Sequence, residues 1–171
     1  MKKLFWTLPI AILACSTFLV PFSHSIQMDP EVKKAYMASD YVMAARLLEQ
    51  HIDQLKQKAL KAEKVDVSDL YMKYIFLAQI YMSKLNKPDE ALSNYLKANE
   101  LRKTSKEMSQ FPSLEFLFIG EIHERKNNLS KAMEYYQNLL KEFSNLQEKE
   151  TDDVMTVMAE DLTKFVKYQT D

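Results

Sequence analysis

The chain has 171 residues, enough for one ordinary domain, and its 23 basic and 24 acidic side chains nearly cancel. Hydrophobic residues make up 47% and charged residues 27% of the chain, a composition typical of globular proteins that excludes a disordered chain. The near-neutral charge also excludes electrostatic capture of nucleic acid. A single glycine, Gly120, is too few for tight hairpin turns or a phosphate-cradling loop, so we predict an all-α fold.

The first 25 residues have the layout of a secretory signal peptide. A short basic region, Lys2 and Lys3, precedes an apolar run at 4–20 and then small residues that end at Ser25. We predict that residues 1–25 are removed and that the mature chain, residues 26–171, is exported to the bacterial periplasm. Cleavage leaves 21 basic and 24 acidic residues, a net charge of −3.

Two alternatives remain open for this segment, and both attach the protein to a membrane. Ile12-Leu13-Ala14-Cys15 resembles a lipoprotein box, in which Cys15 is lipidated and becomes the new N-terminus. Residues 4–20 could instead be retained as an anchor, although this run is at the short end for spanning a bilayer. Cys15 is the only cysteine, so the chain after it can form no disulfide.

The first predicted helix hairpin covers residues 28–58. Ala35 and Tyr36 lead into the polar turn Ser39-Asp40-Tyr41, which is followed by Ala44, Ala45 and Leu48. A small residue, an aspartate and an aromatic residue ahead of an alanine are typical of the turn between two packed helices.

The second predicted hairpin, residues 71–104, is the most regular. Its first helix carries apolar residues at i, i+3, i+4 and i+7, namely Tyr74, Leu77, Ala78 and Tyr81. Pro88 starts the second helix, where its missing N–H costs nothing, and Asp89 and Glu90 follow at the positive end of the helix dipole. The apolar stripe of this second helix is Ala91, Tyr95 and Ala98.

The third predicted hairpin, residues 113–146, repeats this pattern. Its matching positions are Phe116, Ile119, Gly120 and His123 in the first helix, and Ala132, Tyr136 and Leu139 in the second. Gly120 is therefore predicted as the small residue at a helix crossing, and Asn128 as the N-cap of the second helix. We predict the joins between hairpins at 65–69 and 104–112.

The last predicted element is a helix over residues 151–168. Thr151-Asp152-Asp153 is typical of an N-cap and an acidic first turn. Apolar residues follow on one face at Val154, Val157, Met158, Leu162, Phe165 and Val166. We predict that this helix caps the apolar side of the last hairpin.

The three hairpins resemble tetratricopeptide repeats, which are helical hairpins of about 34 residues. The resemblance covers residues 28–146 and implies a right-handed α-solenoid of about three antiparallel hairpins, closed by the C-terminal capping helix. Ala78 and Ala91 lie 13 positions apart, whereas Gly120 and Ala132 lie 12 apart. The second hairpin therefore has one extra residue between its helices.

In this family a peptide or helix of a protein partner binds in a concave groove, which the first helices of the hairpins line. The groove residues that the resemblance implies here are Tyr36, Met37, Met72, Ile75, Gln79, Met82, Leu117, Glu121, Glu124 and Arg125. These positions lack the Lys and Asn pattern of the family's carboxylate clamp, so we do not expect a chaperone tail as the ligand.

Residues suited to catalysis are few. Beyond the signal segment the only histidines are His51 and His123, and the chain has no His-Glu-x-x-His motif, phosphate loop or nucleophile elbow. His123 occupies a packing position, and Glu121 and Glu124 cannot converge with it on one helix. We therefore predict no enzyme, no metal site and no cofactor. The lysines at 56, 58, 61 and 64 are predicted to form a solvated face.

The resulting prediction is a non-catalytic scaffold or adaptor of the bacterial cell envelope, with one unidentified protein partner in the groove. The alternative is a membrane-tethered assembly factor for an envelope complex, held by a lipidated Cys15 or by the retained segment 4–20.

Overall fold

The computed structural model describes residues 28–106, 108 and 113–147. Within these residues the protein has six α-helices and no β-strand, which confirms the all-α prediction. The helices are α2 (Pro30–Met37), α3 (Tyr41–Leu60), α4 (Val67–Ser83), α5 (Pro88–Thr104), α6 (Glu115–Arg125) and α7 (Leu129–Gln147). The predicted signal peptide (1–25) and capping helix (151–168) lie outside the described residues.

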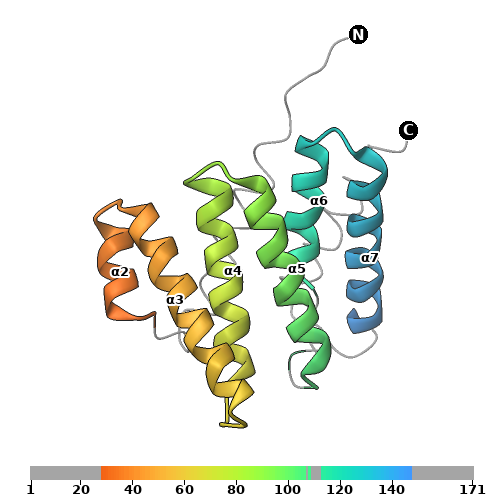
Figure 1. Ribbon diagram of the computed structural model, residues 1–171. Coiled ribbons are helices and arrows are strands. Elements are labelled where there is room, and N and C mark those ends of the chain that lie inside the picture. Colours follow the sequence, from red (N-terminus) through yellow and green to blue (C-terminus); the bar gives the residue numbers. More distant parts are fainter. Residues whose placement is uncertain (1–27, 107, 109–112, 148–171) are drawn as a thin grey trace.

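The helices pack as consecutive hairpins, α2–α3, α4–α5 and α6–α7, with each helix against its neighbours along the chain. The turns within the hairpins lie at the upper end of Figure 1, and the α3–α4 connection lies at the lower end. The predicted array of about three hairpins is therefore confirmed. The turns within hairpins and the α3–α4 connection between hairpins lie at opposite ends of the helices.

Each turn within a hairpin contains one residue in the left-handed backbone region. These residues are Ser39 with φ 59°, Asn86 with φ 52° and Asn127 with φ 58°. Asparagine tolerates this conformation better than most residues, so two of the three turns have a suitable side chain there. The α4–α5 turn occupies 84–87 and the α6–α7 turn occupies 126–128, so the second hairpin has the predicted extra residue.

The second helix of each hairpin starts as its sequence predicts. The Oδ1 atom of Asp40 accepts a hydrogen bond from the N–H of Met43 at 3.0 Å, and Oδ1 of Asn128 accepts one from Lys131 at 3.3 Å. These bonds satisfy amides that would otherwise lack an intrahelical partner. Helix α5 has no side-chain cap and begins directly at Pro88.

The start of α4 differs from the predicted join at 65–69, because the helix already begins at Val67. The carboxylate of Asp66 accepts hydrogen bonds from the N–H groups of Ser68 at 2.9 Å and Asp69 at 3.3 Å, and so caps the helix. The polar composition of this stretch therefore belongs to a helix start, and only its first two residues lie in the connection.

Small residues allow the two helices of a hairpin to pack closely. Ala78 and Ala91, on α4 and α5, are completely buried. A Cβ atom at Gly120 would collide with the ring of Tyr136 on α7, so only glycine fits there and its predicted role is confirmed. Of the stripe residues predicted for the second and third hairpins, only His123 is not fully buried.

Candidate interaction surface

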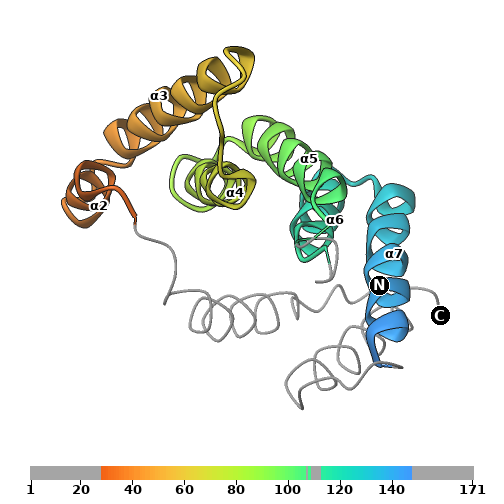
Figure 2. The same ribbon diagram turned by 90° about the horizontal axis from the view of Figure 1, so that it is seen from below.

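The first helices of the hairpins lie together on one side of the array. In Figure 2, α2, α4 and α6 follow one side, and α3 and α5 follow the other. The ten predicted groove residues all belong to α2, α4 and α6. The side chains on these three helices differ in how much surface they leave for a partner.

Helix α4 carries the most continuous candidate surface. Met72, Ile75, Gln79 and Met82 recur at i, i+3, i+7 and i+10, which places them on one face of the helix, and all four are half-buried. Ile75 and Met82 also pack against the core, whereas Met72 is not among the apolar side chains that do so. This face therefore combines a rigid apolar base with side chains that keep part of their surface exposed.

The predicted residues on α2 divide into one structural and one exposed side chain. The ring of Tyr36 lies edge-on to Tyr41 at 5.3 Å between centroids and tilted against Phe76 of α4 at 5.5 Å. Tyr36 therefore helps to hold the first hairpin against the second. Met37 is 76% exposed and is available to a partner.

The predicted residues on α6 are more polar. Glu121 forms an ion pair with Arg125 at 2.6 Å, one turn along the helix. Glu124 accepts a hydrogen bond from the hydroxyl of Tyr136 at 3.1 Å and lines a small pocket of about 30 Å³ beside Met133. That volume holds little more than a water molecule, so Glu124 serves the contact between α6 and α7.

His123 is a packing residue, as predicted. Its ring stacks on Tyr135 at 5.6 Å between centroids and an angle of 12°. Burial lowers the pKa of His123, and the positive charges of Lys131 and Lys126 lower it further, which favours the neutral ring. Among the described residues no group of three or more His, Cys, Asp or Glu side chains is placed to hold a metal ion.

A buried polar cluster that the sequence patterns above do not predict links the second hairpin to the third. We call it the Arg102 cluster; its members are Tyr71, Arg102, Ser113, Glu115 and Glu142. The Nε atom of Arg102 donates to Glu115 at 3.2 Å, and its Nη2 atom donates to Glu142 at 3.1 Å and to the Ser113 hydroxyl. The Tyr71 hydroxyl donates to Glu115 at 3.1 Å. Arg102 is 6% exposed and Glu115 is completely buried, so these charges depend on one another.

The pKa values in this cluster follow from its burial. Burial raises the pKa of the Glu115 carboxyl, and the hydrogen bonds and positive charge around it only partly offset that rise. Burial and the neighbouring Glu115 raise the pKa of the Tyr71 hydroxyl, which therefore stays protonated and donates. The cluster joins residues of α4, α5, α6 and α7, so we assign it a structural role.

Helical spacing contains the signal that would have revealed this cluster. Glu115 lies at i, i+4 and i+7 with Ile119 and Ile122, on the buried face of α6. Arg102 likewise follows Ala98 at i+4 on the buried stripe of α5. A charged residue in phase with an apolar stripe predicts a buried ion pair when a second such residue of opposite sign lies in a packed neighbour.

The comparison with protein families agrees with this geometry. The tetratricopeptide repeat model matches residues 74–105 and 116–145, which correspond to the second and third hairpins. These two hairpins are therefore similar to tetratricopeptide repeats. In these repeats the hairpins are the structural units, and the α2–α3 hairpin stacks on them although it lies outside the matched residues. No curated protein and no solved structure matches the chain.

Tetratricopeptide repeats imply a scaffold for protein–protein interaction with a protein as partner, and such repeat proteins are typically non-catalytic. None of the helices in the described part of the chain is long and apolar enough to cross a membrane.

Proposed function

We propose that this protein is a non-catalytic adaptor of the bacterial cell envelope. It binds an extended peptide or a helix of one partner protein on the side formed by α2, α4 and α6. The observation that supports this proposal is the α4 face of Met72, Ile75, Gln79 and Met82, which is half-buried and largely apolar. Partly exposed methionines suit an adaptable binding surface because their side chains are flexible and polarizable.

The charges beside this face fit the same role. The Glu121–Arg125 pair on α6 is exposed on the arginine side, with the two side chains 28% and 55% exposed. A partner that is apolar along α4 and polar at its α6 end would match both parts. The exposed Met37 on α2 extends the apolar part at the other end.

Site-specific photo-crosslinking in the native host tests the proposal. A crosslinker at Met72 should capture one partner, whereas a crosslinker at Val42 should not, since Val42 is 67% exposed but lies on α3, on the other side of the array. The variant Met72→Gln with Gln79→Glu should lose the partner at least tenfold and keep its thermal stability, because Met72 is not among the apolar side chains packed against the core and Gln79 is already polar. Capture that is equal at the two positions would contradict the assigned side.

The proposed location rests on residues 1–25 and needs its own test. Intact mass spectrometry of the protein from its host should give a chain that starts at Ile26. A mass that begins at a lipidated Cys15, lost in Cys15→Ser, would instead support the lipoprotein alternative, and a full-length mass in the membrane fraction would support the anchor.

A further inference from the structure

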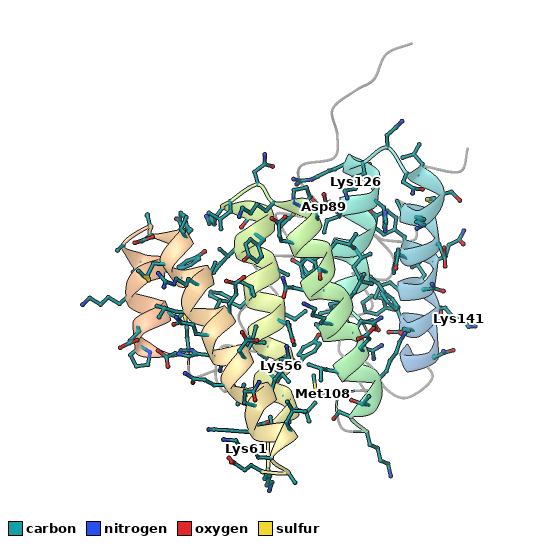
Figure 3. The ribbon with its side chains drawn as sticks, in the orientation of Figure 1. Lys56, Lys61, Asp89, Met108, Lys126 and Lys141 are labelled. Atoms are coloured by element: carbon teal, nitrogen blue, oxygen red, sulfur yellow. The ribbon has the colours of Figure 1, made fainter. Side chains whose placement is uncertain are left out.

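The lower end of the molecule, where α3 meets α4, carries an exposed leucine and three exposed lysines. Leu60, the last residue of α3, is 79% exposed, the most exposed large apolar side chain among the described residues. Lys58, Lys61 and Lys64 lie within four residues of it in the sequence and are all exposed. We call these four residues the α3–α4 tip. Figure 3 shows Lys61 at this end of the molecule and Asp89 and Lys126 at the opposite end.

The acidic residues near the tip are engaged elsewhere. Asp53 pairs with Lys56 at 3.6 Å, Asp66 caps α4, and Asp69 pairs with Lys73. Only Glu63 stands among the three tip lysines, and within the described residues none of these lysines forms an ion pair. The tip therefore presents a positive surface to solvent.

Helix stability explains only part of this arrangement. A lysine in the last turn of α3 interacts favourably with the negative end of the helix dipole, which accounts for Lys58. It accounts neither for Lys64, beyond the helix, nor for an exposed leucine at the most prominent position. Exposed apolar side chains combined with nearby lysines are typical of peripheral proteins that touch an anionic lipid surface.

The tip also projects beyond the rest of the first hairpin. Asp29, next to the start of α2, lies beside His51 at 3.8 Å, and Leu60 follows nine residues later on α3. At a rise of about 1.5 Å per residue the tip extends roughly 14 Å past the point where the chain enters α2. The eight residues 21–28 span at most about 28 Å, so a chain held in a bilayer by residues 4–20 would let the tip reach that bilayer.

We propose that the α3–α4 tip docks on a bilayer that carries anionic headgroups, with Leu60 inserted among them and the three lysines at the headgroup phosphates. This contact goes beyond the proposed adaptor function. It uses the α3–α4 tip, whereas the protein partner is proposed to bind on the side formed by α2, α4 and α6.

A tryptophan reporter in the full chain tests this proposal. Trp6 is the only tryptophan, so Trp6→Phe with Leu60→Trp gives a single reporter at the tip. With vesicles of phosphatidylglycerol and phosphatidylcholine its emission should shift to the blue, and brominated acyl chains should quench it. Vesicles of phosphatidylcholine alone should give neither effect. The matched control is Trp6→Phe with Leu129→Trp, since Leu129 is 52% exposed at the start of α7, at the other end of the array, and should stay in water.

The lysines are tested in the same reporter background. Each lysine near an anionic surface raises the affinity about fivefold, so Lys58→Gln, Lys61→Gln and Lys64→Gln together should weaken the interaction of the reporter about 100-fold. Lys33→Gln, Lys131→Gln and Lys141→Gln remove the same charge from exposed positions elsewhere and should leave the emission shift unchanged.

Three results would overturn the proposal. The reporter at position 60 stays in water on anionic vesicles, or it shifts equally on neutral ones, or the two lysine sets behave alike. The wild-type protein could instead capture an acidic protein and show no response to vesicles. If the triple lysine variant then lost that protein, the tip would be a protein-binding site. The variant Met72→Gln with Gln79→Glu should keep the vesicle response, so failure of the adaptor proposal and failure of this one are distinguishable.

Discussion

The three described hairpins meet at two joints, and these are held by different chemistry. At the first joint, between α2–α3 and α4–α5, the ring of Tyr36 contacts Phe76 and the Tyr81 hydroxyl donates to Glu49. At the second joint, between α4–α5 and α6–α7, Tyr95 stacks on Phe118 at 5.2 Å and the buried Arg102 cluster lies beside them. The first joint relies on aromatic rings, and the second adds the buried charges of Arg102 and Glu115.

The two joints should therefore respond differently to substitution and to pH. Aromatic contacts tolerate small shifts, since each ring pair contributes only about 0.5–1.5 kcal/mol beyond its buried area. A buried ion cluster keeps its stability only while each charge has its partner, because an unpaired buried charge is strongly unfavourable. The second joint should therefore be the more sensitive one to substitution and to pH.

The largest effect is expected for Arg102→Leu. This variant leaves Glu115 and Glu142 without their common cation, so the free energy of unfolding should fall by about 3–5 kcal/mol. Urea denaturation followed by circular dichroism measures the change. Replacing Arg102, Glu115 and Glu142 together by leucine should recover a large part of the loss, and a cost below about 1 kcal/mol for Arg102→Leu would remove the proposed contrast between the joints.

A smaller effect is expected at the first joint for Tyr36→Leu. Two ring contacts are lost, to Tyr41 and Phe76, while an apolar side chain still fills the site, so the cost should be about 1–2 kcal/mol. Met37→Leu is the control, because Met37 is 76% exposed and its replacement should change little. A loss as large as that for Arg102→Leu would show that the two joints are equally critical.

The smallest effect is the pH dependence that Glu115 gives to the second joint. The folded state raises the pKa of Glu115 above its ordinary value of 4.5, so between the two values it binds more protons than the unfolded state. This contribution to stability is complete below the ordinary pKa and is lost as pH rises through the folded pKa. Arg102 and Tyr71 partly offset the shift, which keeps the effect small.

Unfolding curves from pH 4 to pH 8 for the wild-type protein and Glu115→Gln measure this contribution. The amide mimics the protonated carboxyl, and its oxygen still accepts from Arg102. The stability of the variant should therefore decrease less than that of the wild type as the pH rises. Tyr36→Leu should keep the wild-type pH profile. Parallel curves for the wild type and Glu115→Gln would contradict the assignment.

Much of the fold could be predicted because it depends on local rules. Pro88, Asp40 and Asn128 mark helix starts through backbone chemistry that acts within one turn. Helical spacing alone predicts the apolar stripes from Tyr74 to Tyr81 and from Ala91 to Ala98. Gly120 occupies the same position in its hairpin as Ala78. The start of α4 was placed too late because the polar residues after Asp66 suit both a connection and a capped first turn, and only the hydrogen bonds distinguish the two.

The candidate surface was only partly predictable. The spacing of Met72, Ile75, Gln79 and Met82 defines one face of α4. It does not reveal that the ring of Tyr36 packs against Phe76. Nor does it reveal that Glu124 is bonded to Tyr136 across the third hairpin. These contacts join residues far apart in the sequence, so local patterns contain no record of them.

The sequence by itself determined that this protein is a series of helical hairpins, because proline, capping residues and apolar spacing each act over a few neighbouring residues. The tertiary structure decided which charges are buried and which are presented. Arg102 and Lys61 are both ordinary cations in the sequence, yet stacking of the third hairpin buries the first beside Glu115, while the length of α3 carries the second to an exposed tip. Burial depends on what the neighbouring hairpin covers, and that is a property of the assembled array.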